Sequence, residues 1–452
     1  MQTLSSDQRP APGAHGLTLA PFRGVRYASD RVSGIANVTS PPYDVIGPGT
    51  VERLLESEPH NVVRLILPGA RSPQSPHGPE TSQLAARDLY GWLASGVLVR
   101  DPEPALYAYE QSVPANGGDT PGTGGSGVSR WEVLQRGLIG ALRLVPAGSP
   151  SVLPHEDVMP GPVEGRRELM ETAQANLEPI FLLYDSGEDG GQATGGPGSQ
   201  ATRLVDEAAT TREPILSAVT DDGIRHRVWA LTDPAEHAAI SADLARRSAL
   251  IADGHHRYET ALAFHRENPA LPGADRVMMT FVNMHSPGLK ILATHRVVGG
   301  IPNFDPGEFI RQAAAGFEVA QVPSLEALQR AWAESPDRAI IGAAIAARLY
   351  LIEARDSAGQ LDVAILHDRL LRGLLGIGEE AVREEKNLRY VRGLDAAVAE
   401  ARSGAAQIAF LLKPVSVDAV ARISFGGGVM PQKSTDFYPK LLSGLTIYRL
   451  ES

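Results

Sequence analysis

Short apolar runs alternate with amphipathic stretches along most of the chain. Segments with apolar residues three and four positions apart predict helices, here at 164–176, 235–247, 256–266, 324–333 and 363–375. Runs rich in Val, Ile, Leu and aromatic residues are typical of strands, here at 61–67, 105–111, 137–145, 179–184, 225–231, 276–283, 289–298, 348–353, 407–412 and 445–450. Because helices and strands do not alternate strictly, the pattern predicts a mixed-sheet α/β fold with α+β character.

Changes in composition divide the chain. Residues 112–129 and 186–202 consist mostly of Gly, Pro, Ser, Thr and other polar residues, so we expect two mobile surface insertions. Residues 1–16 are predicted to be a flexible tail. A Gly-Gly-Ile-Pro sequence interrupts the pattern directly after a strand run. We therefore expect an N-terminal and central α/β domain over 17–298 and a C-terminal α/β subdomain over 299–452.

Bulk composition narrows the class of protein. The 452 residues, 43% of them hydrophobic, can form a large core and more than one domain. A net charge of −11 disfavours non-specific binding to nucleic acid or to anionic membranes. The sequence has no cysteine, which excludes disulfides, thiolate nucleophiles and cysteine-ligated metals. With no apolar run of membrane-spanning length and no signal peptide, we expect a cytoplasmic protein without membrane or nucleic-acid partners.

Residues 251–262, IADGHHRYETAL, contain the highest concentration of potentially reactive side chains. An apolar run leads into Asp253 and Gly254, and a helical pattern follows, which predicts a strand, a tight turn and a helix start. Helix N-termini favour anions, and Gly254 would let one approach the backbone. Arg257 could hold a phosphate bidentately. Asp253 fits a helix cap, a magnesium ligand or a general base; the concentration of titratable residues in one turn favours a site over a simple cap.

The same segment resembles the signature of the domain-of-unknown-function ten-fifteen family, an uncharacterised prokaryotic family that carries a ParB-like label. The resemblance covers nearly the whole chain. The other matching stretches are PFRGVRY at 21–27, PPYDVI at 41–46, NVVRLILP at 61–68, HEDVMPGP at 155–162, ANLEPIFLLY at 175–184 and MPQKSTDFYPKLLSGL at 430–445.

A wider resemblance concerns the Gly-His-His-Arg turn alone. It is similar to the G-x-x-R turn of the ParB, sulfiredoxin and free-serine-kinase superfamily, which implies a ParB/sulfiredoxin-like core with an additional mixed α/β subdomain. The resemblance also implies that Gly254, His255, His256 and Arg257 contact nucleotide phosphates. Because this chain has no cysteine and no evident helix-turn-helix segment, a sulfiredoxin-type thiol mechanism is excluded and DNA binding is disfavoured. Of the activities in this superfamily, the resemblance therefore implies phosphoryl transfer to a small, serine-like metabolite.

Further candidates for substrate binding lie in loops and at strand ends. Asp44 could be a ligand or base, or could only form an Asx turn. Arg23 could hold a carboxylate or phosphate, or be a solvated surface residue. His155 and Glu156 could act in acid–base chemistry or bind Mg²⁺, or form an exposed polar loop. His295 ends a strand run, where site residues are common in α/β folds.

The C-terminal region contains a glycine run followed by lysines. Lys433 and Lys440 could form a second site for a phosphate or a substrate carboxylate, with the glycines as a backbone cradle. The spacing is not that of a Walker A motif. Motifs typical of α/β-hydrolases, of zincins and of dinucleotide-binding folds are not present in the sequence.

Taken together, these patterns and the resemblance predict a nucleotide-dependent phosphotransferase, similar to a free serine kinase, that acts on a small hydroxylated metabolite. We expect ATP or ADP, or CTP, with Mg²⁺ as cofactors. Asp253, His256 and Glu259 are the catalytic candidates, and Asp253 is also the metal candidate. Two alternatives stay open: a ParB-like nucleotide switch that binds DNA or a partner, and a metal-dependent hydrolase. A homodimer is left open as well.

Overall fold

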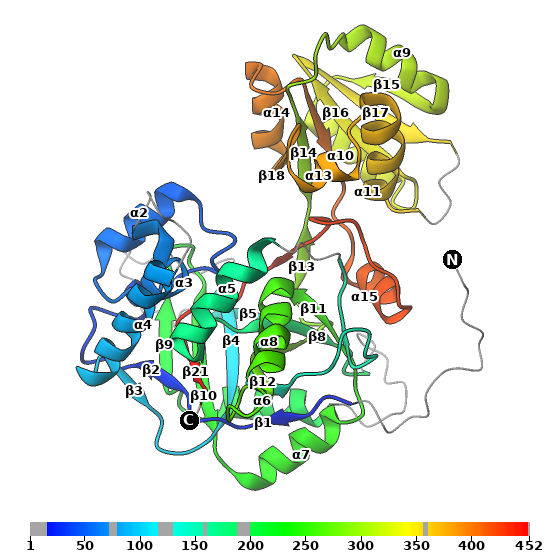
Figure 1. Ribbon diagram of the computed structural model, residues 1–452. Helices are drawn as coiled ribbons and strands as arrows, with labels where there is room; N and C mark the ends of the chain where they lie inside the picture. Colours follow the sequence, from blue (N-terminus) through cyan, green and yellow to red (C-terminus); the bar gives the residue numbers. More distant parts are fainter. Residues whose placement is uncertain are drawn as a thin grey trace, which may run out of the picture. The chain divides into compact units, whose positions relative to one another are not determined.

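The computed structural model describes residues 16–71, 79–115, 130–156, 161–187, 199–355 and 360–450. They form two compact units of mixed α/β structure (Figure 1), so the predicted fold class is confirmed. Unit 1 combines Met1–Pro154, Val158–Leu289 and Pro439–Ser452. Unit 2 consists of His155–Asp157 and Lys290–Tyr438.

Unit 1 is built around one twisted mixed sheet. Its strands run in the order β6 (Val152–Leu153), β11 (Ala249–Asp253), β8 (Ile180–Tyr184), β12 (Arg276–Asn283), β5 (Trp131–Arg143), β4 (Leu106–Pro114), β10 (Arg225–Leu231) and β9 (Leu216–Val219), with β1 (Leu19–Ala20) beside β5. The pairs β11–β6 and β12–β8 are parallel and the other pairs are antiparallel. Every residue of β8 is buried, as its continuous apolar sequence predicts for a central strand.

Helices cover this sheet. α8 (His255–Glu267) packs against β8 and β12 and lies beside α5 (Gly161–Ala173), as Figure 1 shows. α6 (Gln200–Thr211) packs against β4 and β5 and contacts α7 (Pro234–Leu244). The buried residues of α8 include Tyr258, Ala261 and Leu262, so the side of the helix that they form is fixed against the protein.

The N-terminal part of unit 1 forms a separate apolar cluster with α5. The elements of this N-terminal part are β2 (Val25–Tyr27), α1 (Ile35–Val38), α2 (Pro48–Ser57), α3 (Val63–Ile66), a 3₁₀ turn (Pro68–Arg71), α4 (Pro79–Ala94) and β3 (Leu98–Arg100). The predicted strand at 61–67 is wrong, because this apolar run is a short buried helix. Asn61 Oδ1 accepts a hydrogen bond from the backbone N–H of Val63 at 2.9 Å, which favours a helical turn.

Unit 2 is built around an antiparallel sheet in the order β15 (Phe317–Val322), β17 (Arg348–Ala354), β16 (Ile340–Ile345), β19 (Ile408–Leu411), β14 (Thr294–Val298) and β18 (Leu388–Arg392). A further pair joins β13 (Lys290–Leu292) and β20 (Asp436–Tyr438). Val297 and Val298 belong to different apolar clusters, so both faces of the sheet are covered. The helical segments are α9 (Pro306–Gly316), α10 (Leu325–Glu334), α11 (Asp362–Ile365), a π-helical turn (Leu366–Arg372), α12 (Gly373–Leu375), α13 (Glu379–Arg383), α14 (Leu394–Ser403) and α15 (Val417–Phe425).

The units divide at positions that differ from the predicted boundary after residue 298. β14 ends at Val298 and pairs with β18 and β19, so the strand belongs to unit 2 and the change of unit falls at Lys290. The C-terminal segment Pro439–Ser452 returns to unit 1, where β21 (Tyr448–Arg449) pairs with β7 (Ala175–Asn176).

The predicted tail and most of the two predicted insertions, namely 1–15, 116–129 and 188–198, lie outside the described residues. The described ends of the two insertions belong to regular secondary structure. Residues 112–114 continue β4, and Ser199 is the N-cap of α6, accepting a hydrogen bond from Thr202 N at 3.2 Å. In the part of the chain that the structure describes, no helix has the length and apolar character needed to cross a membrane.

Candidate functional site

The predicted strand, turn and helix start are present at the β11–α8 junction. β11 ends at Asp253, and α8 begins at His255 with Gly254 as its N-cap. Gly254 has φ 92° and ψ 29°, a left-handed conformation that favours glycine. A Cβ atom there would lie 2.9 Å from Nε of Arg257, so a larger residue would also displace that side chain.

Asp253 holds two cations at this helix start. Its Oδ2 accepts a hydrogen bond from Arg257 Nη2 at 2.5 Å, and its Oδ1 accepts one from Lys440 Nζ at 3.3 Å. Burial raises the pKa of Asp253, but the charges of Lys440 and Arg257 outweigh it and lower the pKa to about 2. The carboxylate is therefore ionised at neutral pH and is a weak base. Its role in the structure is to fix two positive groups beside the start of α8.

Arg257 connects this ion cluster to the neighbouring strand. Its Nη1 donates to the backbone carbonyl of Pro179, directly before β8. Burial lowers the pKa of the guanidinium, but the carboxylates of Asp253 and Glu178 raise it above its ordinary value. The guanidinium is therefore a permanent, largely buried positive charge between two carboxylates.

Glu178 is a site residue that the sequence analysis did not single out. It is 6% exposed, and its Oε1 accepts hydrogen bonds from Tyr43 N at 3.1 Å and Ser443 Oγ at 3.0 Å. Oε2 lies 3.7 Å from Arg166 Nη1. Burial raises the pKa of Glu178 more than Arg257 and Arg166 lower it. The available signal was an acidic residue next to a run, IFLLY, that is apolar enough to be buried entirely.

Residues of the PPYDVI stretch lie at the edge of this cluster. The Cζ atom of Arg166 is 3.4 Å from the centre of the Tyr43 ring, and that of Arg257 is 6.0 Å from it. Both contacts are of the cation–π kind. The adjacent Asp44 is exposed, and its charge acts on Glu178 and Arg257. The structure therefore places the charge of Asp44 near Glu178 and Arg257.

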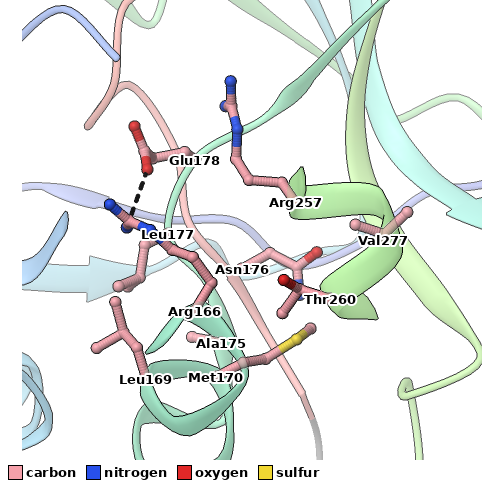
Figure 2. A pocket seen from close by; sticks show the side chains of 10 residues that line it. All are labelled: Arg166, Leu169, Met170, Ala175, Asn176, Leu177, Glu178, Arg257, Thr260 and Val277. Carbon is pink, nitrogen blue, oxygen red and sulfur yellow. Dashed lines mark ion pairs between the residues drawn. The ribbon is translucent and has the colours of Figure 1, made fainter. Parts of the chain in front are cut away.

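A small cavity of about 60 Å³ opens beside Glu178 and Arg257. Figure 2 shows Glu178, Arg166 and Arg257 around one part of it and apolar side chains around another. Asn176 Oδ1 accepts a hydrogen bond from Met278 N at 2.8 Å, whereas its buried Nδ2 has no hydrogen-bond partner among the described residues. The same holds for Nε of Arg257. The other lining residues are Leu169, Met170, Ala175, Leu177, Thr260 and Val277.

The remaining predicted residues of unit 1 take different positions. His255 is buried and His256 is partly exposed, both in the first turn of α8. Glu259 follows Arg257 by two residues, roughly 200° around the helix, and so projects from another side of α8. Arg23 Nε donates to the carbonyl oxygen of Asp101 at 2.8 Å, which fixes it at the start of the segment after β3.

Four predicted residues lie in unit 2 instead. His155 Nε2 is 2.5 Å from Thr435 Oγ1, and Glu156 Oε2 accepts a hydrogen bond from the backbone N–H of Lys433 at 3.1 Å. His295 Nδ1 accepts a hydrogen bond from Leu412 N at 3.2 Å, and burial lowers its pKa to about 4, so it is neutral at pH 7. Lys433 and Lys440 belong to different units, and Lys440 is instead a partner of Asp253.

The donor set for a metal ion is limited. The described ranges contain no group of three or more His, Asp or Glu side chains suited to a metal ion. Within these ranges, no such cluster supports the metal-dependent hydrolase alternative. Mg²⁺ bound to a nucleotide needs fewer protein ligands, because it is usually held by one or two carboxylates together with phosphate oxygens and water. Asp253 is the carboxylate predicted for that smaller role, and its two oxygens accept hydrogen bonds from Arg257 and Lys440.

The chain was compared with known proteins. Residues 19–374 match the model of a family described as protein of unknown function, DUF1015. No curated protein matches the chain. Among solved structures, a conserved hypothetical protein from Pyrococcus furiosus is 17% identical, covering 66% of this chain and 92% of its own, with a TM-score of 0.35. A free serine kinase in complex with AMP is 16% identical, covering 67% and 88%, with a TM-score of 0.37. C-terminally truncated SbnI from Staphylococcus aureus is 11% identical, covering 69% and 87%, also with a TM-score of 0.37.

Proposed function

Since the chain belongs to the DUF1015 family, whose description names no reaction, we propose a function from the site itself. We propose that the protein transfers a phosphoryl group from a nucleotide to the hydroxyl group of a small metabolite. The observation that carries this proposal is the pair of cations, Arg257 and Lys440, that Asp253 holds at the glycine-initiated start of α8.

This arrangement suits a phosphate chain. The N-terminal end of α8 carries a partial positive charge and backbone N–H groups, and Gly254 leaves the backbone open to close approach. Arg257 and Lys440 add two positive side chains that come from different parts of the sequence. Phosphoryl transfer depends mainly on positioning and on charge stabilisation, which a helix start and two fixed cations supply.

The roles of individual residues follow from their surroundings. Arg257 and Lys440 orient the phosphates, with the first turn of α8, including His255 and His256, beside them. Asp253 fixes the cations, and it is the residue that would hold Mg²⁺, which would neutralise phosphate charge. His256 and Glu259 stay candidates for proton transfer. ATP, ADP and CTP are the nucleotides to compare, and the ParB resemblance stays a prediction from the turn alone.

Calorimetric titration of the full chain with ATP, ADP and CTP in the presence of Mg²⁺ tests the proposal. We expect Arg257→Ala to lower nucleotide affinity at least tenfold, because it removes a buried cation from the phosphate site. Arg203→Ala is the matched control, since Arg203 is exposed on α6 and its salt bridge joins it to Glu207 four residues later in the same helix. Unchanged affinity in Arg257→Ala contradicts the proposal. Nucleotide binding without transfer to any acceptor favours a binding switch instead.

A further inference from the structure

The cavity beside the phosphate site presents unused polar atoms of complementary kinds. Asn176 is 6% exposed and uses its Oδ1 in a hydrogen bond to Met278 N, which leaves Nδ2 as a buried donor without a partner. Nε of Arg257 is a second donor in the same situation. A buried donor without a partner is unfavourable, so such groups commonly face water or a ligand. Two of them line one small cavity.

Glu178 adds a hydrogen-bond acceptor to the lining of the same cavity. Its Oε1 already accepts two hydrogen bonds, from Tyr43 and Ser443. Its Oε2 is 3.7 Å from Arg166 Nη1, which is an ion-pair contact but exceeds hydrogen-bond distance. Figure 2 shows this ion pair at the cavity. One oxygen of Glu178 is therefore oriented by the protein, and the other has capacity for a further donor.

A cavity lined by both donors and an acceptor suits a group that can accept and donate hydrogen bonds. A hydroxyl group accepts hydrogen bonds through its oxygen and donates one through its hydrogen. A carboxylate ligand would face the charge of Glu178, and an ammonium group would face Arg257, so a neutral alcohol fits the mixed wall better than either ion. The other lining residues, including Leu169, Met170 and Val277, are apolar and suit a short carbon chain.

The volume limits the size of the occupant. A cavity of about 60 Å³ has room for the order of four to five water-sized groups. A short-chain alcohol therefore fits. Because Arg257 binds Asp253 through Nη2 and also lines the cavity, its side chain links the phosphate site to this cavity.

We propose that this cavity binds the hydroxyl-bearing end of the acceptor, a short-chain alcohol, and that Glu178 removes the hydroxyl proton. The inference deepens the proposed phosphotransferase function and rests on it. Asn176 Nδ2 and Arg257 Nε donate to the hydroxyl oxygen, and the hydroxyl hydrogen points to Glu178 Oε2. During transfer the O–H proton passes to Glu178, and the oxygen forms a bond to the terminal phosphorus of the nucleotide. The bond from that phosphorus to its bridging oxygen breaks, which releases the nucleotide with one phosphate fewer.

Glu178 suits this role better than Asp253. Both oxygens of Asp253 are held by cations, and the pKa of about 2 makes its carboxylate a weak base. Burial raises the pKa of Glu178, which brings it closer to the range in which a carboxylate can take and return a proton.

The test uses the full chain with Mg²⁺ and ATP or ADP, and a panel of ethylene glycol, glycerol, serine, homoserine and water as acceptors. Phosphorylated products and released nucleotide are quantified. We expect Glu178→Gln to lower kcat at least a hundredfold and to leave nucleotide affinity within threefold of wild type. Glu178→Asp restores part of the rate and changes the pH profile of kcat. Glu171→Gln, an exposed glutamate of α5, is the matched control.

A second variant keeps the inference testable if Glu178→Gln does not fold. Asn176→Ala is expected to raise the acceptor KM about tenfold or more, with nucleotide affinity unchanged. A wild-type rate in folded Glu178→Gln overturns the inference, and so does wild-type protein that transfers phosphate to water but to none of the four alcohols. Nucleotide binding with no transfer even to water contradicts the proposed function. Wild-type protein that binds no nucleotide contradicts the proposed function itself, so the two failures are distinguishable.

Discussion

Lys440 Nζ lies 3.3 Å from Oδ1 of Asp253, although the two residues are 187 positions apart in the sequence. Asp253 Oδ2 is held by Arg257 at the same time. One carboxylate therefore joins the C-terminal segment to the β11–α8 turn, and the two cations that it orients form one charge cluster.

Lys440→Met is expected to weaken nucleotide binding about tenfold, which corresponds to roughly 1–2 kcal/mol for a charge-assisted contact. The substitution keeps an unbranched side chain, one atom shorter, and removes the positive charge. Calorimetry with ATP or ADP and Mg²⁺ measures the effect. Lys386→Met is the control, because Lys386 is exposed and lies in unit 2. Equal affinities for the two variants would exclude Lys440 from the phosphate site.

Asp253→Asn is expected to make the stability of unit 1 less dependent on acid. Burial raises the pKa of Asp253, but Lys440 and Arg257 outweigh it and lower the pKa from 3.8 to about 2. A lowered carboxyl pKa stabilises the fold above the unfolded-state value and loses that contribution as the pH falls from about 4 to about 2. Its size is about 2 kcal/mol at pH 7 and about half of that at pH 3.

Urea unfolding at pH 3, 4 and 7, followed by a probe in unit 1, measures this dependence for wild type and Asp253→Asn. The difference in the free energy of unfolding between the two proteins is expected to be largest at pH 7. A difference that stays constant over this range is the contrary result.

Gly254→Ala is expected to destabilise unit 1 by about 1–2 kcal/mol and to abolish nucleotide binding. The left-handed backbone is unfavourable for alanine, and the added Cβ would contact the Arg257 guanidinium. Gly223→Ala is the matched control. Gly223 has φ 78°, and a Cβ there meets nothing within 4 Å. The control should lose similar stability and still bind nucleotide; loss of binding in both variants would mean that backbone strain alone is responsible.

His226→Gln is expected to make the free energy of unfolding of unit 1 less dependent on pH between pH 6.5 and pH 4. His226 is 2% exposed, with Tyr109 Oη 2.7 Å from Nδ1, and burial lowers its pKa to about 4. A lowered histidine pKa means that the unfolded chain binds the proton first. Stability is therefore complete above about pH 6.5 and falls by about 3 kcal/mol as the pH drops to 4. Identical pH profiles of wild type and variant would contradict this.

Local sequence patterns predicted the elements whose own residues determine them. Strands β10 and β12 begin and end where their apolar runs do, and α8 follows the glycine that its left-handed turn needs. The run at 61–67 was predicted as a strand, because a short apolar run fits a buried helix equally well. Asn61, which favours the helical turn there, acts through its side chain rather than through periodicity.

The candidate site was predicted only where it lies in one segment. Asp253, Gly254 and Arg257 share a turn, so their proximity follows from the sequence. Glu178 lies between two strands, and its position beside Arg257 depends on the pairing of β8 with β11. Lys440 was predicted for a separate site with Lys433, because nothing local indicates that the segment from Pro439 onward returns to unit 1.

Because the segment from Pro439 onward belongs to unit 1, the candidate site can be completed only at the end of translation. The ribosome synthesises all of unit 2 before it reaches Lys440 and Ser443, the partners of Asp253 and Glu178. A nascent chain that stops before Pro439 would hold both carboxylates without these partners. The proposed phosphate site would therefore be completed late, after the bulk of the polypeptide has already left the exit tunnel.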